Sequence, residues 1–278
     1  MTKHTLQAST GLPGGGALLV LAIPKSPRWL LTYKQDRIEA AKTLHIIAPT
    51  TDVKAAINRI LAHDAMTTTG ENIFIKKYRF PLLLAFFIAF FNQFSGINAF
   101  LYYAPRIFAA AGLEESSALL SSIGIGATNL VFTLIGLALI DQAGRKQLMY
   151  IGSAGYIISL SLVALAFFQN WQGIAVPMFL FLFIAAHAIG QGTVIWVFIS
   201  EIFPNHLRAS GQALGSSTHW VLAAIIPSLI PLLFAEVGPG PVFALFAFMM
   251  VLQLLFVFFM MPETKGVPLE ELESQLHN

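Results

Sequence analysis

The chain of 278 residues contains no cysteine. Disulfide bonds, thiolate metal sites and thiol nucleophiles are therefore excluded together. Charge is also scarce, because Asp, Glu, Lys and Arg make up only 11% of the residues and the formal net charge is +2. A balance this close to neutral gives no electrostatic basis for binding nucleic acid, and we expect no such partner.

Recognisable enzyme motifs are lacking as well. The sequence has no phosphate-cradling GxxxxGK[ST] element, no cluster with metal-ligand spacing and no nucleophile beside a base. Its seven histidines are scattered along the chain. We therefore expect neither enzymatic activity nor a cofactor nor a bound metal.

Apolar residues dominate the composition instead. They make up 56% of the chain, Phe alone occurs 24 times, and the mean hydropathy is +0.72. Six apolar stretches are long enough to cross a bilayer, which takes about 20 residues; they cover 81–104, 116–140, 148–168, 173–202, 209–235 and 241–261. Such long, continuous stretches do not suit barrel strands, so the sequence predicts an all-α, multi-pass protein of the cell membrane.

The first 80 residues have a different pattern. The apolar run at 17–23 is too short to cross a bilayer, and it resembles a signal peptide only weakly, because a charged segment follows where a cleavage site should stand. Between 24 and 80, DRIEAAKTLHII and VKAAINRILAHD place apolar residues three and four positions apart. This spacing predicts short amphipathic helices that face water.

Lys and Arg are distributed unevenly over the segments between the apolar stretches. Ten of the 16 lie within 24–80, four more lie in alternate loops and the tail, and the opposite loops hold only Arg106. Since cytoplasmic loops are enriched in these residues, we expect 24–80 and the tail to face the cytoplasm.

Four loop motifs occur in a distinctive order: PKSPRWL at 24–30, DQAGRK at 141–146, SEIFPNHLR at 200–208 and PETKG at 262–266. In order and spacing they resemble the PESPR, D-x-x-G-R-[RK], E-x-[FY]-P-x-x-x-R and PETKG elements of the sugar porters, a family of the major facilitator superfamily. The resemblance runs from about Pro24 into the tail, and it implies the carboxy-terminal half of a sugar transporter.

The resemblance also implies a domain organisation. Residues 1–23 would be a remnant of a transmembrane helix, 24–80 a cytoplasmic helical linker, 81–261 a six-helix bundle and 262–278 a cytoplasmic tail. On this expectation the first six helices are missing, and the chain is a truncated product, a fragment of a longer gene or one partner of a split pair. Its partners would be the lipid bilayer, a monosaccharide and a missing amino-terminal six-helix half.

Three amides lie in the first apolar stretch, at Asn92, Gln93 and Asn98. Amides donate and accept hydrogen bonds, which suits sugar hydroxyls, although they equally join helices to one another. The family motif Q-Q-x-x-G-I-N matches Gln93 and Asn98 and favours sugar binding, with Asn92 replacing the first Gln. A straight helix would separate Gln93 and Asn98 by about 140°. We therefore expect the helix to loosen at Ser95-Gly96, so that both amides face one cavity.

The resemblance adds Asn129, Trp196, His219 and Trp220 to the sugar-binding residues. Asn129 stands alone among apolar neighbours, and a helix-packing amide is the alternative. Trp196 ends a G-x-G-P-x-x-W motif in which Thr193 replaces the proline, so the bend there is expected to be weaker. His219 replaces an amide. Neutral imidazole can still donate one bond and accept one, but it could also titrate, and helix contact is its alternative role.

Three further residues are expected to have roles other than direct sugar binding. His187, beside the glycine motif, is expected to pack against other helices. Tyr102 and Tyr103 resemble aromatic residues that close over the sugar from outside, and anchoring at the membrane interface is the alternative.

A set of charges at the cytoplasmic helix ends is predicted to control gating: Arg145, Glu201, Arg208 and Glu263. Solvated residues of the positive-inside kind are the alternative. The family pairs Glu201 with the Arg of the G-R-K motif as a latch, meaning an ion pair whose breaking lets the cytoplasmic side open. Lys25 stands where PESPR has its acidic residue, which predicts a leakier inner gate.

The function expected from the resemblance is secondary transport of a monosaccharide, a hexose or a pentose, by alternating access. The alternative is a membrane fragment, or a sugar-binding or sensing partner, that does not transport by itself. In family members that couple to protons, the coupling carboxylate lies in the first helix, so uniport and symport both stay open.

Overall fold

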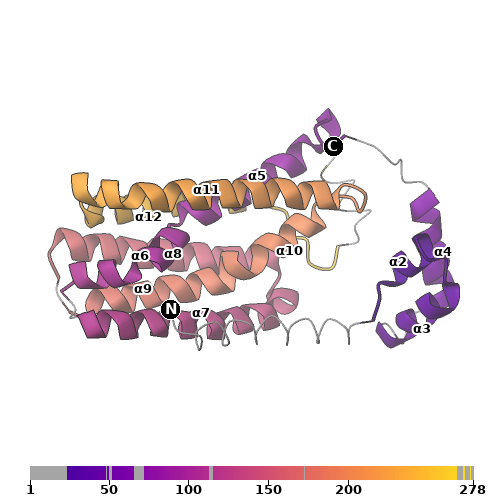
Figure 1. Cartoon of the computed structure of the whole chain (residues 1–278). Helices are drawn as coiled ribbons and strands as arrows, with labels where there is room; N and C mark the ends of the chain where they lie inside the picture. Colours follow the sequence, from indigo (N-terminus) through magenta and orange to yellow (C-terminus); the bar gives the residue numbers. More distant parts are fainter. Residues whose placement is uncertain are drawn as a thin grey trace, which may run out of the picture. The chain divides into compact units, whose positions relative to one another are not determined.

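The structure is a computed structural model, which describes residues 24–47, 49, 52–65, 72–112, 115–171, 173–267, 272 and 276. The chain divides into two compact units, residues 1–70 and 71–278, both drawn in Figure 1. The apolar run at 17–23, expected to be a helix remnant, lies outside the described residues.

The first unit contains three short helices, α2 (Pro27–Thr32), α3 (Arg37–Ile47) and α4 (Val53–Ala65). Asp36 and Asp52 begin the last two, since their carboxylates accept backbone N–H groups of the first turn at 2.9–3.2 Å. A small core of Leu30, Leu31 and Ala40 joins the helices, and apolar residues of α4 pack against it. Helix α3 exposes Ile38, Ile46 and Ile47 at 60–74%. The short helices predicted from residue spacing are confirmed, whereas the apolar side predicted for α3 is largely exposed.

The second unit is a helical bundle. Its elements are η1 (Lys76–Tyr78), α5 (Arg79–Phe94), α6 (Ile97–Ala110), α7 (Glu115–Ala143), α8 (Arg145–Phe168), α9 (Ala175–His187), the π-helical turn η2 (Ala188–Gly192), α10 (Thr193–Glu201), α11 (Arg208–Glu236) and α12 (Pro239–Phe259). They form six spans that are long and apolar enough to cross a membrane, and the described residues contain no strand. The predicted all-α membrane fold is confirmed.

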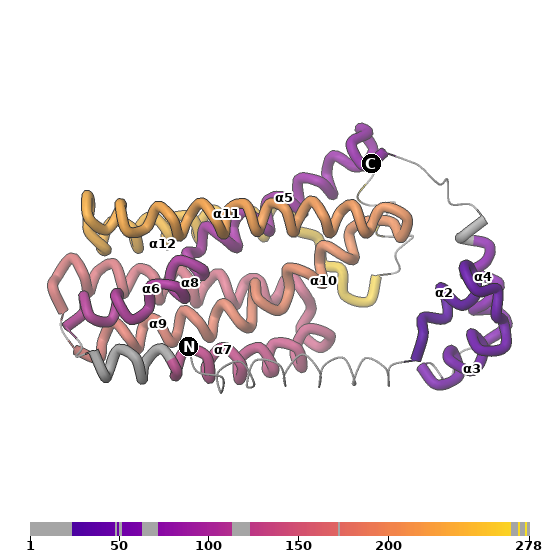
Figure 2. The backbone as a smooth tube through the Cα atoms, in the orientation of Figure 1, coloured from indigo at the N-terminus to yellow at the C-terminus, as the bar shows by residue number. Residues whose placement is uncertain are grey.

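Two of the six spans are composite. The first joins η1, α5 and α6, and the fourth joins α9, η2 and α10. Figure 2 shows the backbone changing direction where α5 passes into α6. In each composite span, 61% of the most apolar segment is buried inside the protein. In α7 and in α11, only 17% of the corresponding segment is buried. The spans with irregular backbone therefore lie at the centre of the bundle, where protein surrounds the irregular backbone.

Small residues allow the central helices to approach closely. A Cβ added to Gly152 in α8 would lie 2.9 Å from the Cα of Gly190 in η2, and one added to Gly155 would lie 2.5 Å from the Cβ of Ala186. Helices in lipid gain stability mainly from such packing and from hydrogen bonds between helices. These contacts hold α9 and η2 directly against α8.

Candidate functional site

The first composite span is interrupted where the sequence predicted. Helix α5 ends at Phe94, Gly96 has a φ of +80°, and α6 begins at Ile97. Glycine tolerates this left-handed backbone. Ser95 stabilises the break, because its Oγ donates to the carbonyl of Asn92 at 2.6 Å and accepts from the N–H of Ile97 at 3.3 Å. The expected loosening at Ser95-Gly96 is confirmed.

The break brings the amides of Gln93 and Asn98 together. Asn98 Nδ2 donates to Gln93 Oε1 at 2.9 Å. Gln93 Nε2 in turn donates to Asn92 Oδ1 at 2.9 Å and lies 3.0 and 3.3 Å from Nδ1 and Nε2 of His219 in α11. Because an amide NH₂ group only donates, a neutral imidazole would accept this bond through its unprotonated nitrogen. We call these linked side chains, the three amides together with the imidazole of His219, the amide chain.

The second composite span contains the π-helical turn η2. On a regular helix, His187 and Trp196 are nine residues apart and would point about 180° away from each other. One extra residue in a π turn removes about 100° of this difference. Thr193 supports the turn by donating from Oγ1 to the carbonyl of Ala188 at 2.6 Å. The glycine motif thus breaks helical regularity without the family's proline.

A cavity of about 240 Å³ lies between these two breaks. Of the residues expected to bind sugar, Asn92, Asn98, Asn129, Trp196 and His219 line it. The other lining residues are Ile97, Leu101, Thr133, His187, Gly192 and Ile195. Hydropathy gave no sign of Thr133, yet it lies four residues after Asn129 and hence on the same face of α7.

Two of the expected residues lie outside this lining. Gln93 is 1% exposed and lies behind the cavity, where the amide chain joins it to Asn98 and His219. Trp220 is 63% exposed, and only the edge contact of its ring with that of His219, at 5.1 Å between centroids, connects it to the site. The structure therefore joins Gln93 to the cavity indirectly and turns Trp220 away from it.

His187 lines the cavity and packs against neighbouring helices at the same time. Its Nδ1 lies 2.5 Å from the hydroxyl of Tyr156, which is fully buried in α8. The expected packing role is thus accompanied by a position in the cavity surface, which residue type alone did not indicate.

The two tyrosines assigned to gating lie on α6. Tyr102 is 61% exposed, whereas Tyr103 is partly buried and packs below Arg106, whose guanidinium carbon is 5.8 Å from the ring centroid. Neither residue lines the cavity, although Leu101 beside them does.

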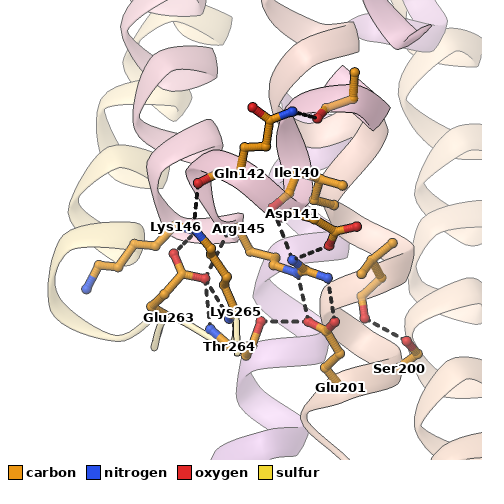
Figure 3. Close-up of polar contacts among 12 residues, drawn as sticks. Ile140, Asp141, Gln142, Arg145, Lys146, Ser200, Glu201, Glu263, Thr264 and Lys265 are labelled. Carbon is orange, nitrogen blue, oxygen red and sulfur yellow. Dashed lines mark hydrogen bonds and ion pairs between the residues drawn. The ribbon is translucent and has the colours of Figure 1, made fainter. Parts of the chain in front are cut away.

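A cluster of charges lies at the helix ends where α8 begins and α10 ends, as Figure 3 shows. The guanidinium of Arg145 donates to both carboxylate oxygens of Glu201, at 2.8 and 3.1 Å, and to Asp141 at 3.0 Å. The side chains of Arg145 and Glu201 are only 10% and 24% exposed, whereas Asp141 is 81% exposed. The pair implied by the family resemblance is therefore present, in a bidentate and largely buried form.

Glu263 joins this cluster from the segment after α12. Its carboxylate accepts the backbone N–H groups of Arg145 and Lys146 at 3.0 Å each, as Figure 3 shows. A carboxylate at a helix N-terminus satisfies free N–H groups and complements the helix dipole. The following residue, Thr264, donates from Oγ1 to Glu201 at 2.6 Å. The PETKG motif thus connects the ends of α8 and α10.

Arg208 and Lys25 are the other charged residues that were expected to affect the gate. Arg208 is the first residue of α11 and is partly buried. Lys25, in the first unit, lies 3.8 Å from Glu39 Oε1, and both side chains are about half exposed, at 59% and 48%. The expected leakiness of the inner gate stays a prediction.

The chemistry available in the cavity is that of neutral hydrogen bonding. Amides, a hydroxyl and imidazoles supply donors and acceptors, and the indole of Trp196 supplies a flat apolar face. Among the described residues, no group of three or more His, Cys, Asp or Glu is placed to hold a metal ion.

Comparison with known proteins gives consistent matches. A family model described as "Sugar (and other) transporter" matches residues 4–276. The putative metabolite transport protein YwtG of Bacillus subtilis is 34% identical over 264 residues, which cover 93% of this chain and 58% of that protein. The D-xylose-proton symporter of Escherichia coli K12 is 33% identical over 265 residues, which cover 92% and 53%.

A solved structure shares the fold. The proton:xylose symporter XylE bound to 6-bromo-6-deoxy-D-glucose superposes with a TM-score of 0.80 at 32% identity, covering 93% of this chain and 56% of that one. The chain spans about half the length of the curated relatives it matches. With its six spans and these matches, the chain is a multi-pass membrane protein that belongs to the sugar porter family of the major facilitator superfamily.

Proposed function

We propose that this chain supplies one half of a secondary transporter that moves a monosaccharide, a hexose or a pentose, by alternating access. The observation that carries the proposal is the cavity at the two helix breaks, which presents polar but uncharged groups inside a membrane bundle. Polar residues in such a position are functional candidates because burying them without partners costs free energy. The sugar-proton symporters among its relatives support the same class of substrate.

The donor and acceptor pattern suits a sugar better than an ion. Each hydroxyl both donates and accepts, and Asn98 and Asn129 each present an amide that can do the same. Trp196 can cover the apolar face of a pyranose ring, while an ion would require charged or multiple oxygen ligands. No Asp, Glu, Lys or Arg lines the cavity in the described part of the chain.

The charge cluster of Arg145, Glu201 and Glu263 is proposed to hold the adjacent end of the path closed. The cluster joins the ends of α8 and α10 to the segment after α12, so separating these helices would break the bidentate pair. A contact worth a few kcal/mol is enough to shift a two-state equilibrium by orders of magnitude without locking it.

Reconstitution tests this proposal. The chain would be placed in liposomes, alone and together with an amino-terminal half taken from a relative, and exchange of labelled D-xylose and D-glucose would be measured. We expect exchange from the paired halves and slower exchange at low sugar concentration in Asn98→Ala. Absence of both exchange and sugar binding in every combination would contradict the proposal.

A second function is a sugar-binding or sensing partner that does not transport. The observation favouring it is that the residues lining the cavity all belong to this chain. Calorimetric binding of a monosaccharide to the chain alone, with no exchange in either liposome preparation, would favour this second function over the first.

A further inference from the structure

A second hollow lies on the bundle surface, between the start of the first span and α11. Its volume is about 380 Å³, and we call it the Arg79 groove. Six residues line it: Phe74, Arg79, Leu82, Leu83, Phe86 and Leu214. Five of them are apolar and the sixth carries a positive charge.

The charge and the apolar surface lie at different depths. Arg79 is the first residue of α5 and lies three residues inside the first span, which begins at Lys76. Phe86 lies seven residues further along α5, which is about 10 Å at 1.5 Å per residue. Leu83 and Phe86 are 46% and 39% exposed, and they form an open apolar surface inside the span. The groove therefore has a cationic entrance at the boundary and an apolar floor in the hydrocarbon.

Positive charge predominates in the sequence around the entrance. Lys76, Lys77 and Arg79 lie within four positions, and the nearest carboxylate along this segment is Glu71. Basic residues beside a span attract anionic lipid, by about 1 kcal/mol each near the surface. In sequence, three cations thus stand against one carboxylate.

The entrance is held in a defined conformation. Asn72 Oδ1 accepts the backbone N–H of Phe74 at 2.9 Å, and the backbone N–H of Tyr78 donates to the carbonyl of Ile75 at 3.1 Å. The ring of Tyr78 is fully buried, and Lys77 Nζ lies 5.1 Å from its centroid. Phe74 itself is 71% exposed above the groove.

We propose that the Arg79 groove binds one anionic phospholipid, with the headgroup phosphate at Arg79 and an acyl chain along Leu83, Phe86 and Leu214. A soluble anion would gain nothing from the apolar floor. A zwitterionic lipid would bring its own ammonium group next to Arg79. An acyl chain together with net negative charge matches both parts of the groove. The assignment does not depend on the proposed transport function.

Native mass spectrometry of the detergent-solubilised chain tests it, with phosphatidylglycerol or phosphatidylcholine added in equal amounts. We expect the phosphatidylglycerol-bound fraction to exceed the phosphatidylcholine-bound fraction, and inorganic phosphate not to compete. Arg79→Gln should weaken phosphatidylglycerol binding by about fivefold, the equivalent of one lost cation. Arg79→Lys, which keeps the charge, should retain most of the binding.

Two further variants control for location and for folding. Arg106→Gln removes an exposed cation at the opposite end of the same span and should leave binding unchanged. Leu214→Trp should fill the floor and reduce binding of both lipids. Each variant is compared only as a monodisperse, helical protein.

Three outcomes would overturn the proposal: equal retention of the two lipids, equal losses in Arg79→Gln and Arg106→Gln, or competition by inorganic phosphate. A protein partner in the groove would also overturn it. Because the chain has no cysteine of its own, Leu83→Cys provides a single thiol. Disulfide-linked dimers of this variant in liposomes would assign the groove to a second copy of the chain.

Discussion

The side chain of Gln93 distributes its hydrogen bonds among three neighbours. Its carbonyl accepts from Asn98, and its NH₂ group reaches Asn92 and His219. Rotating the Gln93 amide by 180° would place like groups opposite one another at Asn92 and Asn98, so the direction of one of these bonds fixes the other. The amide chain therefore orients the polar atoms that Asn98 presents to the cavity.

Asn98→Ala should weaken monosaccharide binding. Loss of one hydrogen bond from the cavity is worth about 0.5–1.5 kcal/mol, or up to about tenfold in affinity. Gln142→Ala removes an exposed amide that lies outside the cavity and serves as the matched control. Equilibrium binding of labelled sugar to the purified proteins measures both, and equal affinity in the two variants would count against a cavity role for Asn98.

Replacing His219 separates its hydrogen bonding from its shape. In His219→Leu the buried NH₂ of Gln93 loses an acceptor, which should cost about 1–3 kcal/mol of stability. His219→Gln restores an acceptor and should recover most of that loss. Thermal unfolding in detergent compares the two, and identical midpoints would show that the contact with Gln93 contributes nothing measurable.

Among the helices, the break between α5 and α6 depends on a glycine. Gly96 has a φ of +80°, and a Cβ added there would lie 2.6 Å from the ring of Phe246 in α12. Gly96→Ala should therefore destabilise the protein by at least about 1 kcal/mol. Gly126→Ala in α7 meets open space and should be neutral or stabilise slightly, so unfolding midpoints that fell equally in both would refute the strain argument.

A buried polar contact holds the π-helical turn from the side away from the cavity. Gln191 Nε2 donates to Gln253 Oε1 in α12, and Gln253 Nε2 donates to Ser153 in α8 at 2.8 Å. All three side chains are fully buried. These bonds tie η2 to two neighbouring helices.

A double-mutant cycle measures this contact. Gln191→Leu and Gln253→Leu should each destabilise, since each leaves the other amide without its partner. The double variant should lose less than the sum, with a coupling of about 0.6 kcal/mol, the average found for such bonds in membranes, and at most about 1.7 kcal/mol. Strictly additive losses in thermal unfolding would mean that the two amides do not interact.

Hydropathy predicted the number and kind of these elements, but not their ends. The third stretch was expected to begin at 148, whereas α8 begins at Arg145, because Glu263 satisfies its first N–H groups. The orientation of Gln93 could not be predicted either, since its neighbour His219 lies 126 residues away in sequence. The break at Ser95-Gly96 was predictable because it follows from local spacing and glycine.

For the molecule as a whole, the charge cluster joins segments that are far apart in the sequence. Arg145 contacts two carboxylates of very different exposure, Glu201 at 24% and Asp141 at 81%. Glu201→Gln should cost about 1–3 kcal/mol, because it leaves a largely buried guanidinium without its main partner. Asp141→Asn should cost less than about 1 kcal/mol, as exposed pairs do.

Thermal unfolding at low and high salt distinguishes these two carboxylates. Added salt should remove the small contribution of Asp141 and leave most of that of Glu201, because buried pairs are screened less. Equal losses in Glu201→Gln and Asp141→Asn would contradict the unequal roles assigned to them.

The π-helical turn at Ala188–Gly192 can also be regarded as a one-residue insertion into an otherwise regular helix. Converting 188–192 into a regular α-helix without removing a residue would rotate every later position of α10 by about 100°. Trp196 would then leave the cavity, and Glu201 would leave Arg145. A change of helix type that leaves the chain length unchanged would thus disconnect the binding cavity and the charge cluster in a single step.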